Sequence, residues 1–237
     1  LADAVASAVA AYALSEASGS ALDSIGSRDL TDNGTVGAGT GLFAGARDFD
    51  SGVPEYFSRA SEATFVFGDE NFTMTAWTKL EDKASSHGVI GKFEVSDEYA
   101  CYYSSASDRF LFSFTAQTIT GNTFGSPSTG VWNLLVFGYD ADNDQYFLSI
   151  NGGAKDTYST SSGITSSASN PFLIGSVRTG LFPMNGLIDD VVLLRGYVLS
   201  ATEITELWNS GTGVAFADWD GGGGGGNRRR RFLIMCA

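Results

Sequence analysis

The sequence predicts an all-β fold: a two-sheet antiparallel sandwich with one short helix near the C-terminus and an extended Gly/Arg tail. Hydrophobic residues make up 43% of the 237 residues and charged residues 17%, a balance that allows a sizeable core. Alternation with a period of two recurs along the chain, and 30 glycines can supply tight turns. Clear helical spacing is confined to residues near 200–209. About a dozen strands and one late helix indicate two packed sheets.

The alternation places side chains on opposite faces of each strand. In FTMTAWTKL, residues 72–80, Phe72 and Met74 share one face while Thr73 and Thr75 share the other. Further strands are predicted at 8–14, 46–50, 55–59, 88–93, 99–103, 110–114, 171–175 and 185–194. The apolar stretch LADAVASAVAAYAL leads into the first strand, and it lacks the basic flank of a signal peptide.

Two long strands form a predicted hairpin in the middle of the chain. VWNLLVFGYD and QYFLSING are joined through DADND, a loop rich in turn residues. Asn151-Gly152 then gives a second tight-turn signal. The acidic loop Asp140–Asp144 also suggests a metal loop, but the glycine and distant glutamate of an EF-hand are missing. A plain hairpin turn is the favoured interpretation.

The period changes at SATEITELW. Ser200 and Glu203 have the spacing of a capping box, which satisfies two backbone donors at a helix start. Ile204, Leu207 and Trp208 follow at helical spacing and are expected to pack the helix onto a sheet. Gly211 is expected to end it.

Charge and cysteine content exclude several classes of function. The net charge is −13, and subtracting the four C-terminal arginines (−13 − 4) leaves −17 on the rest of the chain. Such a body repels nucleic-acid phosphates and anionic membrane surfaces. With two cysteines and one histidine, His87, neither a zinc ribbon nor a disulfide framework is expected. Cys101 is expected to be a buried strand thiol, although a bridge to Cys236 remains open. The sequence contains no run of 18 or more apolar residues, so no membrane span is predicted.

The composition shifts sharply near the C-terminus. We therefore divide the chain into a sandwich domain, residues 1–219, and a tail, residues 220–237, in which a glycine-rich linker precedes a basic patch and an apolar tip. One interpretation is a disordered tail. The other is a tail that binds an acidic surface of a neighbouring subunit, with contacts from Arg228, Arg229, Arg230, Arg231 and Phe232.

The ordered set of motifs resembles the concanavalin A-like jelly rolls of the laminin-G type. VAAYALSEASGSALDSIGSRDLTDNGTV is similar to the family's opening strand and turns, and ARDFDSGVPEYFSRA to its next hairpin. FTMTAWTKL, the central hairpin and NGLIDDVVLLRGYVLSATEITELW follow in the family's order. The resemblance spans residues 8–215 and implies a jelly roll. Asn133 replaces the family's usual His, and RGYVLS stands where an aromatic-Asn pair is common. LWNSGTGVAFADW resembles the ending of many phage structural proteins.

Two adjacent carboxylates interrupt the closing strand. Asp189 and Asp190 should point to opposite faces, so Asp190 is expected to face solvent. A buried carboxylate needs a cation or several N–H donors. The resemblance implies a structural Ca²⁺ held by Asp189 with Asp23 and backbone carbonyls. The alternative is that Asp189 accepts hydrogen bonds from backbone amides or turn hydroxyls.

Catalytic patterns are not found in the sequence, so a non-enzymatic protein is expected. Neither the Glu-x-Asp-x-x-Glu string of jelly-roll glycosidases nor a Gly-x-Ser-x-Gly elbow occurs. Exposed aromatics can instead form a platform for sugar rings. Tyr99, Tyr102 and Tyr103 on one strand, together with Tyr56, are the candidates; the alternative is that most are core or interface residues.

Three functional hypotheses follow. The first is a virion-associated structural protein, a phage-like capsid decoration or fibre domain anchored to neighbouring subunits by its tail and able to contact host glycans. The second is a secreted or cell-surface adhesin that binds carbohydrate. The third is a carbohydrate-active enzyme. We favour the first hypothesis because of the tail, the acidic body and the phage-like ending. The expected location of the protein is therefore a virion surface or the extracellular space.

Overall fold

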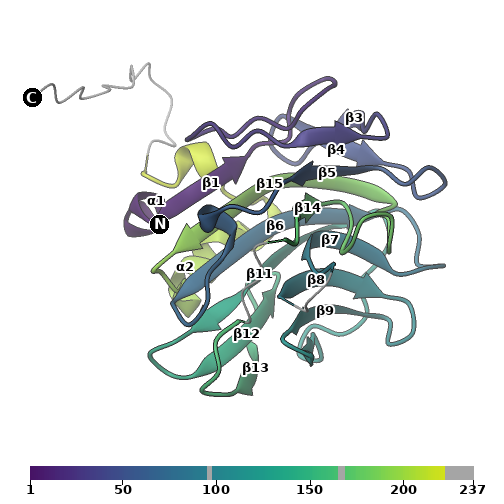
Figure 1. The fold of residues 1–237 in the computed structure, drawn as a ribbon. Helices are drawn as coiled ribbons and strands as arrows, with labels where there is room; N and C mark the ends of the chain where they lie inside the picture. Colours follow the sequence, from purple (N-terminus) through teal and green to yellow (C-terminus); the bar gives the residue numbers. More distant parts are fainter. Residues whose placement is uncertain (95–97, 165–168, 222–237) are drawn as a thin grey trace, which may run out of the picture.

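A computed structural model describes residues 1–94, 98–164 and 169–221 of the chain. Two antiparallel sheets pack face to face in these residues (Figure 1), which confirms the predicted all-β sandwich. Across the described ranges, no helix is long and apolar enough to cross a membrane. The tail residues Arg228 to Arg231, Phe232 and Cys236 lie outside the described residues.

The larger sheet carries the closing strand near its centre. Its main order is β13-β12-β11-β6-β15-β4-β3, and β1 also pairs with β15. Its strands are β1 Ala8–Tyr12, β3 Gly37–Thr40, β4 Gly45–Phe49, β6 Phe72–Leu80, β11 Trp132–Asp140, β12 Gln145–Ile150, β13 Asp156–Ser159 and β15 Gly186–Arg195.

The smaller sheet follows the order β10-β9-β8-β7-β14-β5-β2. Its strands are β2 Thr31–Asn33, β5 Tyr56–Arg59, β7 His87–Lys92, β8 Tyr99–Ser104, β9 Arg109–Phe114, β10 Gln117–Thr120 and β14 Phe172–Ile174. The ladder Ile174, Ile90, Cys101, Phe112 and Ile119 runs across five of these strands. All five side chains belong to the core between the sheets. The prediction that Cys101 is a buried strand thiol is confirmed.

The helical elements are short. They are α1 Ala2–Ala6, α2 Ala201–Trp208, and the 3-10 turns η1 Ala63–Phe65, η2 Asn209–Gly211 and η3 Phe216–Asp218. The predicted capping box is present: Ser200 Oγ accepts from Glu203 N at 3.3 Å, and Ser200 N donates to Glu203 Oε2 at 2.8 Å. The helix ends at Asn209, whose φ of 44° is left-handed, two residues before the predicted Gly211. Helix α1 was not predicted.

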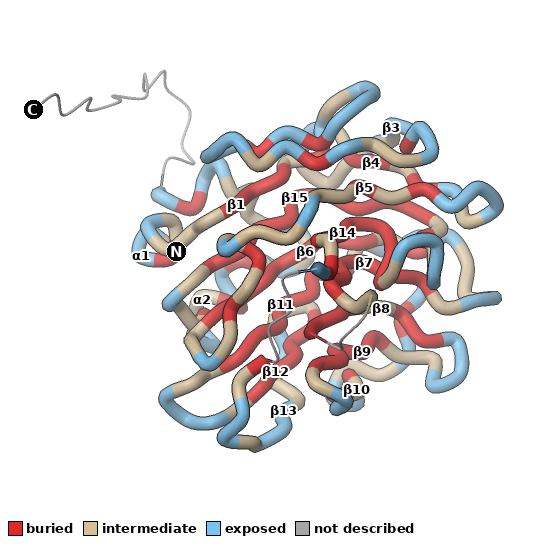
Figure 2. Tube along the Cα trace, in the orientation of Figure 1, coloured by how far each residue is buried: buried red, intermediate tan, exposed pale blue. Residues whose placement is uncertain are grey.

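Two hydrophobic cores cover both faces of the larger sheet. The first lies between the sheets and contains most of the buried aromatic residues. The second lies on the outer face of the larger sheet, where Ile204 and Leu207 of α2 pack over Trp77, Leu134 and Val192. Figure 2 shows the resulting burial of β6, β11 and β15. The larger sheet is therefore an inner layer, covered on both faces.

Candidate functional site

A β-bulge in β15 determines where the two adjacent carboxylates lie. Asp189 pairs with Trp77 and Val192 with Thr75, so β15 carries one residue more than β6 between these pairs. The extra residue is Asp190, with a left-handed φ of 46°. Both side chains therefore line one cavity. The prediction that Asp190 faces solvent is wrong, because the bulge breaks the alternation on which it relied; Asp190 is 6% exposed.

This cavity has a volume of about 210 Å³ and is lined mainly by small side chains of the N-terminal, 43–45 and 215–217 segments. Burial raises the pKa of Asp190 to about 7, against the hydrogen bond from Phe216 N, and neighbouring Asp189 and Asp218 raise it further. Burial also raises the pKa of Asp189 to about 6, although three backbone N–H groups oppose the shift. Each carboxylate accepts a hydrogen bond from the backbone of a different loop. Asp189 Oδ2 accepts from Leu42 N at 2.8 Å, and Asp190 Oδ2 accepts from Phe216 N at 2.8 Å.

Asp23, the predicted partner of Asp189 in a calcium site, is held by a different set of donors. Its Oδ1 accepts from Ala11 N and Ile25 N, both at 3.2 Å, and its Oδ2 accepts from Arg28 N at 3.2 Å. Asp23 is not among the residues that line the cavity of Asp189.

The donor set fits the backbone-capping alternative for Asp189 better than a Ca²⁺ cage, because N–H groups already occupy Asp189 Oδ2 and both carboxylate oxygens of Asp23. Within the described ranges, no three His, Cys, Asp or Glu side chains gather as a metal cluster. Calcium at Asp189 and Asp23 stays a prediction.

The four candidate tyrosines separate into two groups. Tyr99 and Tyr103 point into the core between the sheets and are 0% and 1% exposed. Tyr99 donates to Phe65 O at 2.9 Å, and Tyr103 to Asp108 Oδ1 at 2.9 Å. A sugar platform needs an exposed ring face, so the assignment of Tyr99 and Tyr103 to one is wrong for this structure. The core alternative describes both.

Tyr102 and Tyr56 are partly exposed. Tyr102 lies on the opposite face of β8 from Tyr99 and Tyr103, as strand alternation requires. Its ring stacks on the partly exposed Phe182, with centroids 5.6 Å apart and an interplanar angle of 28°. The two rings form an aromatic pair on the outer face of the smaller sheet. Tyr56 lies on β5, three strands away from β8 in the sheet order.

Hydroxyl groups lie beside this pair on the outer face. Ser113 Oγ lies 3.4 Å from the Tyr102 hydroxyl and 2.8 Å from Thr118 Oγ1, so hydroxyl groups continue across β9 and β10. On the other side, residues 176–182 cross the sheet over β7. A Cβ at Gly91 would lie 2.3 Å from Val177 O, so glycine is needed for this close approach. The crossing segment brings Phe182 to Tyr102, a contact that no sequence pattern predicts.

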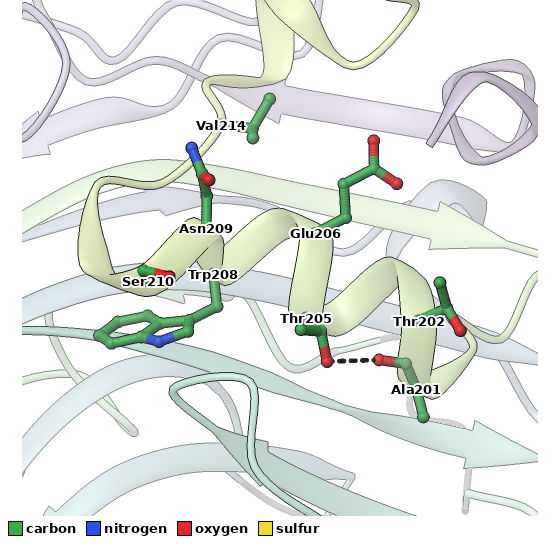
Figure 3. A pocket seen from close by; sticks show the side chains of 8 residues that line it. All are labelled: Ala201, Thr202, Thr205, Glu206, Trp208, Asn209, Ser210 and Val214. Carbon is green, nitrogen blue, oxygen red and sulfur yellow. Dashed lines mark hydrogen bonds between the residues drawn. The ribbon is translucent and has the colours of Figure 1, made fainter.

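A second surface depression, of about 720 Å³, runs along α2 (Figure 3). Thr202, Glu206 and Asn209 line it and are exposed, whereas Trp208 is partly buried. The Trp208 ring stacks on Trp77 with centroids 5.4 Å apart and an interplanar angle of 17°. The Trp208 ring packs against the second core, so we assign it a packing role.

The comparisons with known proteins agree with this architecture. The model of the concanavalin A-like lectin/glucanases superfamily, in its laminin-G form, matches residues 55–205, more than half of the chain. The chain belongs to this superfamily. No curated protein matches it by sequence.

Solved structures with the same fold are similar at low sequence identity. Domain 4 of AbnA, an extracellular arabinanase from Geobacillus stearothermophilus, in complex with arabinotriose, has a TM-score of 0.63 at 19% identity; the match covers 84% of this chain and 97% of that one. The binding domain of Paraclostridial Mosquitocidal Protein 1 has a TM-score of 0.66 at 14% identity, with 87% and 52% covered. The binding domain of botulinum neurotoxin serotype D has a TM-score of 0.63 at 12% identity, with 88% and 53% covered. This chain thus spans about half the length of the two toxin binding domains.

Proposed function

We propose that this protein is a non-enzymatic carbohydrate-binding domain that acts outside the cell. Its superfamily and its likeness to an arabinanase domain solved with arabinotriose support this function. The acidic body and the absence of catalytic motifs from the sequence are compatible with a binding role. If incubation with a polysaccharide released products in proportion to the amount of added protein, that result would instead support an enzyme.

We place the sugar site on the outer face of the smaller sheet. The observation that carries this assignment is the partly exposed Tyr102–Phe182 pair, next to the hydroxyls of Ser113 and Thr118. An apolar ring face beside a few convergent polar groups is the usual composition of a small-molecule site. The ring would contact the C–H face of a sugar while the exposed Thr118 hydroxyl bonds to its O–H groups.

The test is calorimetric titration with arabinotriose, followed by a glycan array if arabinotriose does not bind. Tyr102→Ala should weaken binding about tenfold or more, equivalent to about 1.4 kcal/mol or more. Tyr102→Phe keeps the ring and should retain most of the affinity. Tyr158→Ala is the matched control, because Tyr158 is an exposed tyrosine on β13 of the other sheet. Equal losses in Tyr102→Ala and Tyr158→Ala would contradict the assignment.

A second candidate role is assembly on a virion surface, with the tail binding a neighbouring subunit. The support is the sequence alone: four consecutive arginines followed by Phe232, beyond a glycine linker on an acidic body. This role is compatible with glycan binding, because a decoration protein can present a sugar-binding face outward. Deletion of the tail tests it.

A further inference from the structure

A pocket at one end of the sandwich brings two arginines together on this strongly acidic chain. The pocket has a volume of about 340 Å³ and is lined by Ala8, Val9, Ile25, Arg28, Ala63, Thr64 and Arg195. These residues come from β1, the loop before β2, η1 and the end of β15. The pocket shares no lining residue with the Tyr102–Phe182 site.

Thr64 contacts both guanidinium groups. Its Oγ1 accepts from Arg28 Nε at 2.8 Å. The Arg195 Nη2 group donates to Ala63 O at 2.6 Å and Val66 O at 2.5 Å, with Thr64 O at 3.3 Å. The Arg195 guanidinium also lies over the Phe67 ring, 5.1 Å from its centroid. Both arginines are therefore held in place before any ligand arrives, which lowers the entropy cost of binding.

Donor capacity remains on both side chains. A guanidinium has five N–H donors. Within the described residues, side-chain hydrogen bonds use only Nε of Arg28 and Nη2 of Arg195. The Arg195 Nε also has no hydrogen-bond partner among those residues, but it is buried and faces away from any ligand. The Nη groups are therefore the donors that an oxyanion in the pocket would contact.

Three carboxylates lie near these arginines, and two of them, Asp23 and Glu62, have other partners as well. Asp23 lies 3.6 Å from Arg28 Nη1 but also accepts three backbone hydrogen bonds. Glu62 lies 3.5 Å from Arg28 Nε and 3.2 Å from Arg59 Nε. Glu70 lies 3.4 Å from Arg195 Nη1. The carboxylates therefore orient the arginines from outside the lining of the pocket, and none of the three lines it.

From this geometry we infer that the pocket binds the carboxylate of an acidic sugar residue. A guanidinium pairs well with a carboxylate, and both arginines contact Thr64 and line the same pocket. The apolar lining of Ala8, Val9 and Ile25 suits the C–H face of a sugar ring, and the volume suits a single ring. The net charge of −13 opposes polyanions, which favours a ligand with a single carboxylate.

The test compares two probes that differ only at C6: methyl β-D-glucuronoside and methyl β-D-glucoside. Titration of the full chain, followed by NMR, should show saturable binding of the glucuronoside, with a Kd on the order of millimolar, and at least tenfold weaker binding of the glucoside. Acetate is the third probe and should bind at least tenfold more weakly than the glucuronoside. Equal affinity for acetate and the glucuronoside would overturn the assignment to a sugar acid.

Arg28→Gln should weaken glucuronoside binding at least tenfold. Arg59→Gln is the matched control, because Arg59 has a similar exposure, also pairs with Glu62 and does not line the pocket. Thr64→Val, which removes the acceptor that holds Arg28, should weaken binding several-fold and is a second variant in case Arg28→Gln is unstable. Equal effects of Arg28→Gln and Arg59→Gln, or no effect of Arg28→Gln in a folded protein, would overturn the inference.

The inference rests on the proposed function only in that its ligand is a sugar. Arabinotriose is uncharged, so a parallel titration separates the two sites. Arg28→Gln should leave arabinotriose binding unchanged, and Tyr102→Ala should leave glucuronoside binding unchanged.

Discussion

At the scale of single residues, Asp190 shows how one inserted position changes the environment of a charge. The bulge turns its side chain into the cavity that Asp189 also lines. Burial then raises the pKa of Asp190 from 3.8 to about 7. The folded state therefore binds a proton more tightly than the unfolded state, so this group makes the protein less stable as pH rises from about 4 to about 7.

Asp190→Asn should remove this part of the pH dependence. The amide keeps an oxygen for Phe216 N but carries no charge. Relative to the parent, the variant should gain free energy of unfolding, on the order of a few kcal/mol, between pH 5 and pH 8. Urea unfolding of both proteins at the two pH values measures this double difference. If the variant and the parent differ in free energy of unfolding by the same amount at both pH values, Asp190 is not the titrating group. The Asp189 carboxyl is present in both proteins, so its own titration does not account for a difference between them.

Asp189 tests the calcium prediction directly. If Ca²⁺ binds, Asp189→Ala should lower the melting temperature mainly when calcium is present. An equal loss in calcium and in chelator would mean that Asp189 stabilises the fold through Leu42 N and Phe43 N alone. The hydrogen bonds favour the second result, with a cost of about 1–3 kcal/mol for the buried donors left unpaired. Differential scanning calorimetry with calcium or EDTA distinguishes the two.

At the scale of elements, α2 is important because it closes the second core. Ser200→Ala removes the N-cap acceptor for Glu203 N and should cost about 1 kcal/mol of stability. Chemical denaturation measures this loss. Thr202→Ala is the control, because Thr202 is an exposed residue of the same helix and is not its N-cap. Arabinotriose binding should be unchanged in both variants, since α2 lies against the other sheet. Weaker binding in Ser200→Ala alone would link the helix to the sugar site.

Elements with strong alternation or a complete cap could be predicted from the sequence, and weakly patterned edges could not. The ranges of β6, β11, β12 and α2 follow from period and capping. The edge strands β2, β3, β10 and β13 are short and mostly polar or glycine-rich, so packing of neighbouring strands defines them.

The candidate site was predictable only in part, because it depends on contacts between distant parts of the chain as well as on strand alternation. Alternation places Tyr102 opposite Tyr99 and Tyr103, but it does not say which face of a strand is buried. Phe182 lies in a loop at a φ of 53°, and no period links it to Tyr102. Its position depends on Val177 passing over Gly91, a tertiary contact between distant parts of the chain.

At the scale of the whole molecule, the sandwich and the tail should behave independently. Residues 1–219 contain both cores, so deletion of residues 221–237 should leave the melting temperature within about 2 °C of the parent. If the tail anchors the protein to an assembly, the same deletion should abolish co-purification with a large particle. Size-exclusion chromatography of native material measures this. Co-purification that persists without the tail would contradict anchoring by Arg228 to Arg231 and Phe232.

The central claim is that the outer face of the smaller sheet binds sugar. The most direct measurement is an NMR titration of the ¹⁵N-labelled chain with arabinotriose, read out by residue. The account predicts saturable shifts centred on Tyr102, Ser113, Thr118 and Phe182, which are lost in Tyr102→Ala. Saturable shifts centred instead on residues 201–214 along α2, with the smaller sheet unaffected, would contradict it.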